Sequence, residues 1–259
     1  MKVFLETSIH IQRLLHTVER KAKIREKLAG KYILTSTYVY MEFRRGVMQS
    51  FAYVQTLLRQ VQREGRFLLN IGDFLVRLSE SPGIFRSRRA IQRTMLVLSV
   101  LFNEFRSDVF PIEDAIDFLD FWILQLEKDD FFEGIDELVN PTDCDLSKPQ
   151  APLGDLISSR LSCNAATAQC KLVKFLDSQK PKLSQIENVL ADLPRAQRDQ
   201  RAFSALQRIQ TDITKALGER TCWALSDIII ALEAPEDARI YTVDKHFRSI
   251  CLALGKSLL

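Results

Sequence analysis

Four acidic residues stand at positions from which their side chains could act together. Glu6 and Asp244 each follow a short apolar run, whereas Glu42 and Asp227 each lie within a segment of helical periodicity. Carboxylates that lie close together repel one another, and a divalent cation with oxygen and water ligands, Mg²⁺ or Mn²⁺, compensates their charge. Such a site suits hydrolysis of phosphodiester bonds, because the cation orients the phosphate and lowers the pKa of a bound water.

Two ends of the chain contain the elements that would position these acids. Short apolar runs predict strands at residues 3–5, 32–34 and 239–243. Helical spacing follows the first two strands, and the hydroxyls of residues 35–37 suit a helix N-cap. The first helical run comprises Ile11, Leu14, Leu15 and Val18. Strands that alternate with helices are typical of α/β proteins, whose ligands bind beyond the carboxyl ends of the strands, so Glu6 and Asp244 are expected to converge.

The middle of the chain has a different pattern. From about residue 51 to 219, apolar residues recur at helical periods and few runs resemble strands. Proline and glycine breaks divide this segment into six to eight helices. The sequence therefore predicts a discontinuous α/β domain, residues 1–50 plus 220–259, interrupted by a large all-helical insertion, residues 51–219.

Composition excludes several classes of protein. The chain has 259 residues, a net charge of +3 and 46% hydrophobic residues, which is typical of a globular protein with a packed core and not of a disordered chain. Five cysteines do not suggest a disulfide framework, and we assign no metal to them. No apolar run reaches the roughly 20 residues of a membrane helix, and the amino terminus lacks a signal-peptide pattern. We expect a cytoplasmic protein without a membrane partner.

The charge is unevenly distributed along the chain. Residues 1–112 carry a net charge of +10, residues 113–145 of −11 and residues 146–259 of +4. Basic helix faces outside the acidic block are candidates for contacts with phosphates of nucleic acid, although solvated faces are the alternative reading. The first candidate set comprises Arg86, Arg88, Arg89 and Arg93. The second comprises Arg195, Arg198, Arg201 and Arg208.

Four segments together resemble the motifs of PIN-domain nucleases. They are Val3-Phe4-Leu5-Glu6-Thr7-Ser8, Thr35-Ser36-Thr37-Tyr38-Val39-Tyr40-Met41-Glu42-Phe43, Ser226-Asp227-Ile228-Ile229-Ile230-Ala231 and Ile240-Tyr241-Thr242-Val243-Asp244-Lys245-His246-Phe247. Each motif alone is weak, and the resemblance depends on their order and context. It covers roughly residues 1–50 and 220–255, about a third of the chain.

The resemblance implies a PIN-like α/β/α sandwich with a small parallel sheet and a divalent-metal site that uses Mg²⁺ or Mn²⁺. The acidic quartet would be Glu6, Glu42, Asp227 and Asp244, and Thr7 and Thr242 would be hydroxyls that orient a carboxylate or water. It further implies endonuclease activity, with RNA favoured over DNA, as in toxins of toxin-antitoxin pairs. An inhibitory or regulatory protein partner and a homodimer follow as expectations.

Two features depart from the family pattern. Glu6 stands where the family normally has Asp, and 184 residues separate Glu42 from Asp227. One alternative is therefore a catalytically silent PIN-like domain that acts as a nucleic-acid-binding or protein-interaction scaffold. Another alternative is a mainly helical adaptor, in which the two ends of the chain are structural and the insertion carries the function.

Overall fold

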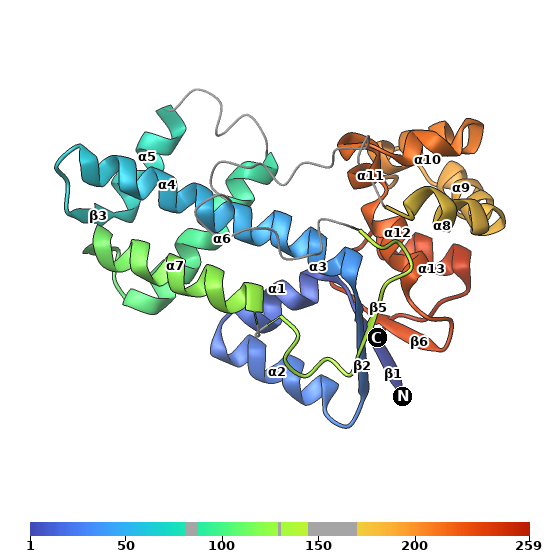
Figure 1. Ribbon diagram of the computed structural model, residues 1–259, viewed down its shortest axis with the longest axis horizontal. Helices are drawn as coiled ribbons and strands as arrows, with labels where there is room; N and C mark the ends of the chain where they lie inside the picture. Colours follow the sequence, from blue (N-terminus) through green and yellow to red (C-terminus); the bar gives the residue numbers. More distant parts are fainter. Residues whose placement is uncertain (81–87, 129–130, 145–169) are drawn as a thin grey trace.

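A four-stranded parallel sheet lies at the centre of the part that carries both termini (Figure 1). The computed structural model describes residues 1–80, 88–128, 131–144 and 170–259. The strand order is β5-β2-β1-β6. The strands are β1 Lys2–Leu5, β2 Tyr32–Ser36, β5 Glu137–Val139 and β6 Ala238–Tyr241. The predicted α/β class with a small parallel sheet is confirmed.

Strand β1 lies between β2 and β6, and helices cover its apolar residues on both faces of the sheet. Val3, Phe4 and Leu5 are fully buried, as expected for a parallel strand between helix layers. In the register, Phe4 lies opposite Leu34 of β2 and Ile240 of β6. The predicted strands at the two ends of the chain are thus direct neighbours.

Helices cover both faces of the sheet. On one face, Leu5 and Ile33 share a core cluster with Ile9 and Ile24 of the first two helices. These helices are α1 Thr7–Leu15 and α2 Val18–Leu28. On the other face, Phe4 belongs to a cluster with residues of α3, α12 and α13. Their bounds are α3 Thr37–Phe43, α12 Ser226–Glu233 and α13 Phe247–Leu254.

The remaining helices form two groups on opposite sides of the molecule (Figure 1). In the first group, α4 packs against α6 and α7. Its elements are the π-helix η1 Arg44–Met48, α4 Gln49–Arg63, β3 Leu68–Asn70, α5 Ile71–Glu80, α6 Arg88–Phe105, β4 Val109–Pro111 and α7 Ile112–Lys128. In the second group, α9 packs against α10 and α13. Its elements are α8 Leu172–Ser178, α9 Lys180–Asp192, α10 Gln200–Thr211, the 3₁₀-helix η4 Ile213–Ala216 and α11 Glu219–Ala224.

The expectation of an all-helical middle segment is wrong at three strands. β3 and β4 form an antiparallel pair, and β5 joins the central sheet beside β2. Each of these strands has three residues, too few for a strand pattern to stand out in the sequence. Two hydrogen bonds of Asp136, the residue before β5, hold this strand against β2. Asp136 accepts a hydrogen bond from the N–H of Ile33 at 2.6 Å, and its own N–H donates to the Ile33 carbonyl at 2.9 Å.

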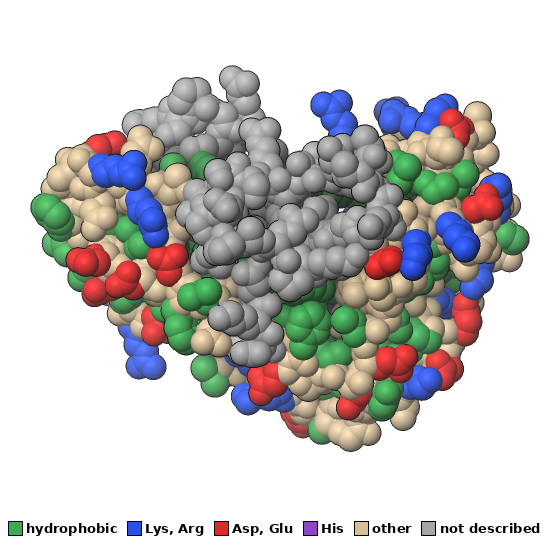
Figure 2. Space-filling model, viewed as in Figure 1, with side chains coloured by type: hydrophobic (Ala, Val, Ile, Leu, Met, Phe, Trp, Pro, Cys, Tyr) green, Lys and Arg blue, Asp and Glu red, His purple; other side chains and the backbone are tan. Residues whose placement is uncertain are grey.

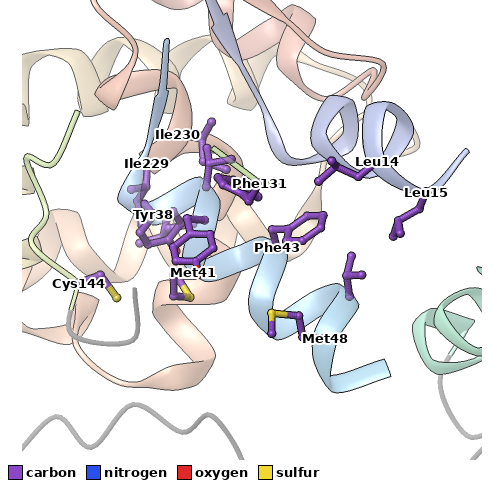
Figure 3. Close-up of a cluster of buried hydrophobic side chains, with 14 of the residues drawn as sticks. Leu14, Leu15, Tyr38, Met41, Phe43, Met48, Phe131, Cys144, Ile229 and Ile230 are labelled. Atoms are coloured by element: carbon purple, nitrogen blue, oxygen red, sulfur yellow. The ribbon is translucent and has the colours of Figure 1, made fainter. Parts of the chain in front are cut away.

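One continuous core crosses the predicted domain boundaries. Its buried residues come from β1 and β2 and also from α4, α6, α7 and α9. Figure 3 shows Tyr38, Met41 and Phe43 of α3 near Phe131 and Ile230, and the rings of Phe43 and Phe131 lie 5.1 Å apart. The division into two domains stays a prediction. Within the described ranges, no helix combines the length and apolar character needed to cross a membrane.

Candidate functional site

The four predicted acids meet in one pocket. Glu6, Glu42, Asp227 and Asp244 all line it, together with Thr7. The pocket has a volume of about 220 Å³, which is room for several water-sized groups, since a water occupies about 30 Å³ of the liquid. Residues from both ends of the chain therefore form a single site.

The sheet and the helices that follow it explain this convergence. Glu6 directly follows β1 and is the N-cap of α1, and its N–H donates to the Tyr241 carbonyl at the end of β6 at 3.2 Å. Asp244 follows β6, so both acids leave the same edge of the sheet. Glu42 lies in the last turn of α3, and Asp227 lies in the first turn of α12. The helix α3 begins where β2 ends because the Ser36 hydroxyl accepts from the N–H of Val39 at 3.1 Å.

Hydroxyl groups fix the Glu6 carboxylate. The N–H of Ser8 donates to it at 2.9 Å, and the Ser8 hydroxyl donates to its other oxygen. Thr242 also donates to this second oxygen, at 2.9 Å. The same Thr242 hydroxyl accepts from the N–H of Asp244 at 2.9 Å, so it links two of the acids.

A third hydroxyl, that of Thr7, lies against Glu42. The Thr7 hydroxyl donates a short hydrogen bond to a Glu42 carboxylate oxygen. Both threonines that the sequence places beside the acids are thus in contact with a carboxylate. Thr7, near the start of the sequence, holds Glu42, and Thr242, near its end, holds Glu6.

Burial and mutual repulsion destabilise the charged form of two of the acids. Burial raises the pKa of Glu6 to about 7, and the nearby Glu42 charge adds to the shift, while the bonds from Ser8 and Thr242 oppose it. Burial also raises the pKa of Asp227 well above its usual value, and the charges of Glu42, Asp244 and Glu6 raise it further. In this pocket Glu6 and Asp227 therefore keep their protons to a higher pH than isolated carboxyl groups do.

The side chains that line the pocket offer oxygen atoms, the type of donor that a hard divalent cation takes. Within residues 1–80, 88–128, 131–144 and 170–259, however, no group of three or more His, Cys, Asp or Glu side chains is arranged so that it could hold a metal ion. Mg²⁺ is usually held by only one or two carboxylates and retains several waters. The four acids line one pocket, and their binding of a cation stays a prediction.

Two residues of the pocket were not assigned a role from the sequence. Arg45 and Trp223 both line the pocket, and the Arg45 guanidinium lies over the Trp223 ring. Arg45 belongs to the π-helix η1, which has a wider turn than an α-helix and which no sequence pattern revealed. Trp223 belongs to α11, a short helix that ends at Ala224 and is separated from α12 by Leu225.

The predicted arginine surfaces stay predictions. Arg86 lies outside the described residues, and for Arg88, Arg89 and Arg93 the structure describes only the backbone of α6. Leu96, one turn further along α6, lines the pocket, so this helix passes beside it. In the second set, Arg198 donates to the carbonyls of Ala191 and Leu193 near the end of α9, which is a structural role.

Basic and acidic side chains are interspersed over the group formed by α8, α9 and α10. Figure 2 shows this mixture on the right of the face that it presents. A surface of mixed sign is typical of a solvated exterior. The described residues on this part of the surface therefore do not form a continuous basic track.

Comparisons of the chain with protein-family models, with curated proteins and with solved structures give no match. The resemblance to PIN-domain nucleases therefore depends on the motifs of the sequence. The convergence of the four acids is an observation independent of that resemblance.

Proposed function

We propose that this protein is a divalent-metal-dependent endonuclease that hydrolyses phosphodiester bonds, with RNA as the favoured substrate. The observation that supports it most strongly is the pocket in which Glu6, Glu42, Asp227 and Asp244 meet. Four acids from four separate segments of the chain, two of them with raised pKa values, are costly for a fold to keep together. Perturbed carboxylates in a pocket are typical of functional sites.

Glu42, Asp227 and Asp244 would hold the cation, Mg²⁺ or Mn²⁺, and Glu6 would complete its surroundings directly or through water. When bound, the cation would neutralise phosphate charge and favour attack by water on the phosphorus. Thr7 keeps the Glu42 carboxylate oriented through its hydrogen bond. With a pKa of about 7, Glu6 can hold or release a proton near neutral pH.

Several parts of this proposal depend on the motif resemblance alone. They are the preference for RNA, a role as a toxin, defence or RNA-processing nuclease, a regulatory protein partner and a homodimer. Sequence specificity is not part of it. Cleavage of DNA instead of RNA would change the substrate class and leave the reaction type intact.

Cleavage of end-labelled single-stranded RNA and DNA by the purified full chain tests the proposal. Each substrate is incubated with Mg²⁺, with Mn²⁺ and with EDTA. We expect internal cuts in the RNA with either cation and none with EDTA. Equal cutting in EDTA, or no cutting in any condition, would refute the metal-dependent nuclease.

One observation favours a second candidate function. The Glu6 carboxylate already accepts three hydrogen bonds, from two groups of Ser8 and from Thr242, which leaves it less capacity to bind a cation. A catalytically silent scaffold that binds nucleic acid or protein would keep such a residue. Retained nucleic-acid binding without cleavage, together with cleavage gained in Glu6→Asp, would support this candidate and identify the longer side chain as the cause.

A further inference from the structure

Three cysteine side chains line a second, smaller pocket. They are Cys144, Cys170 and Cys222, and all three are reduced thiols in the structure. The pocket has a volume of about 20 Å³, which is room for about one water molecule. The residues that surround so small a space lie close to one another, so the fold gathers three thiols at one place.

The three thiols come from segments that are distant in the sequence. Cys144 follows β5, Cys170 precedes α8, and Cys222 lies in α11. The first two segments are held side by side through the carbonyl of Thr142, which accepts from the N–H of Lys171 at 2.9 Å and from the Cys170 thiol at 4.0 Å. The third thiol completes the lining from the opposite end of the chain.

Solvent reaches part of this cluster. Cys170 and Cys222 are partly exposed, whereas Cys144 is buried. A thiol that solvent reaches, with a second thiol close by, is typical of cysteines that oxidants convert into reversible disulfides. The first thiol reacts with the oxidant, and the second resolves the product.

The small pocket shares part of its lining with the pocket of the four acids. Tyr38, Met41 and Trp223 line both pockets. The hydroxyl of the buried Tyr38 donates to the carbonyl of Cys222 at 2.9 Å and lies 3.2 Å from the Cys222 sulfur. Because Cys222 also directly precedes Trp223, a displacement of Cys222 acts on residues that form the pocket of the four acids.

We propose that Cys222 is a redox-sensitive thiol, which a hydroperoxide such as hydrogen peroxide joins to Cys144 or Cys170 in a reversible disulfide, and that this disulfide loosens the contact of Cys222 with Tyr38. The inference goes beyond the proposed nuclease activity and does not depend on it.

The reaction balances with hydrogen peroxide as the oxidant. One thiol sulfur takes an oxygen atom as the oxygen–oxygen bond of the peroxide breaks, which gives a sulfenic acid and one water. The second thiol attacks this sulfur, so that the sulfur–sulfur bond forms and a second water leaves. Two thiols lose two electrons and two protons in total, and the peroxide is reduced to two waters. Dithiothreitol reverses the oxidation by thiol–disulfide exchange.

Peptide mapping of the full chain tests the proposal without any variant. The reduced protein is incubated with hydrogen peroxide, the remaining thiols are alkylated, and the digest is analysed by mass spectrometry without reductant. We expect a pair of peptides joined through Cys222 and either Cys144 or Cys170, which dithiothreitol separates. Recovery of Cys222 as a thiol or a sulfinic acid, or its linkage to Cys163 or to a second chain, would overturn the proposal.

Cys251 provides an internal reference in the same digest. It is buried in α13, and burial raises the pKa of its thiol to about 11. A thiol with so high a pKa reacts slowly with peroxide, so Cys251 should be recovered as an alkylated thiol. Oxidation of Cys251 to the same extent as Cys222 would show unfolding by peroxide and would overturn a specific reaction at the cluster.

Hydrogen exchange tests the effect of the disulfide on the neighbouring helices. We expect faster exchange of the amides of α11 and of the first turn of α12 in the oxidised protein, and the rates of the reduced protein after dithiothreitol. Cys222→Ser is the matched control, since its hydroxyl can still contact Tyr38, and peroxide should leave its exchange rates unchanged. Equal exchange of the reduced and the fully cross-linked wild type would overturn the loosening of this contact.

Discussion

Thr242 donates a hydrogen bond of 2.9 Å to Glu6, a residue 236 positions earlier in the chain. The bond connects the segment after β6 to the residue after β1, and the same hydroxyl accepts from the N–H of Asp244. One side chain therefore sets the relative position of two of the acids. The site depends on adjacent parallel strands, which place these segments at one edge of the sheet.

Removal of this hydroxyl should lower activity. We expect Thr242→Val to reduce kcat/KM for RNA cleavage by about 10- to 100-fold, because a hydrogen bond to a charged group contributes about 1.5–3 kcal/mol. Thr242→Ser keeps the hydroxyl and is the control. Equal activity of the valine and serine variants would contradict an orienting role for Thr242.

Neutralising Asp227 should stabilise the fold, with an effect that grows with pH. The pKa of Asp227 is raised in the folded state, so the unfolded chain releases this proton more readily and wild-type stability falls as pH rises above about 4. Asp227→Asn has no such proton. We therefore expect the variant to exceed the wild type in free energy of unfolding by more at pH 8 than at pH 5, measured by urea denaturation in EDTA. A variant less stable than the wild type at both pH values would contradict the repulsion described for this pocket.

Cation binding should be visible without any nucleic acid. At 100 times its dissociation constant, Mn²⁺ should raise the free energy of unfolding by about 2.7 kcal/mol. Thermal denaturation with and without Mn²⁺ measures this as a higher Tm. Asp192→Asn, a change at the exposed end of α9, should keep the whole shift, and Asp227→Asn should lose most of it. An equal shift in Asp227→Asn would show that the cation binds elsewhere.

The attachment of β5 to the sheet can be tested through Asp136. Its carboxylate accepts from the N–H of Ile33, a buried residue of β2. We expect Asp136→Ala to lower the free energy of unfolding by about 1–3 kcal/mol, because the N–H is left without its partner. Asp136→Asn keeps an acceptor and should lose less. Urea denaturation of the two variants measures the difference, and an alanine variant as stable as the wild type would argue against this contact.

The sequence predicts those elements whose pattern is long or strongly apolar. The strand at residues 3–5 is a fully buried run, and the acid that follows it was located with it. Val18 shows the limit of periodicity: it continues the spacing of Leu14 yet is 76% exposed. The chain ends α1 at Leu15 and starts α2 at Val18, where the Thr17 hydroxyl accepts from the N–H of Arg20 at 3.4 Å. A local cap thus overrides an apolar period.

Two residues of the pocket, Arg45 and Trp223, show which contacts sequence patterns do not predict. Arg45 and Trp223 meet through the packing of η1 near α11, and neither residue follows a strand or belongs to a motif. The strand β5 was likewise missed because its three residues are at the sheet edge and Leu138 is 42% exposed. Such contacts depend on tertiary packing, which is encoded over the whole chain and not in any local spacing.

We propose above that the four acids form a metal-dependent hydrolytic site. Its most direct test is the single-turnover rate at which the full chain cuts end-labelled single-stranded RNA in Mn²⁺, compared among the wild type, Asp227→Asn and Asp192→Asn. We expect cutting by the wild type and by Asp192→Asn, and a rate lower by about 100-fold or more in Asp227→Asn. Cutting by Asp227→Asn at the wild-type rate would contradict it.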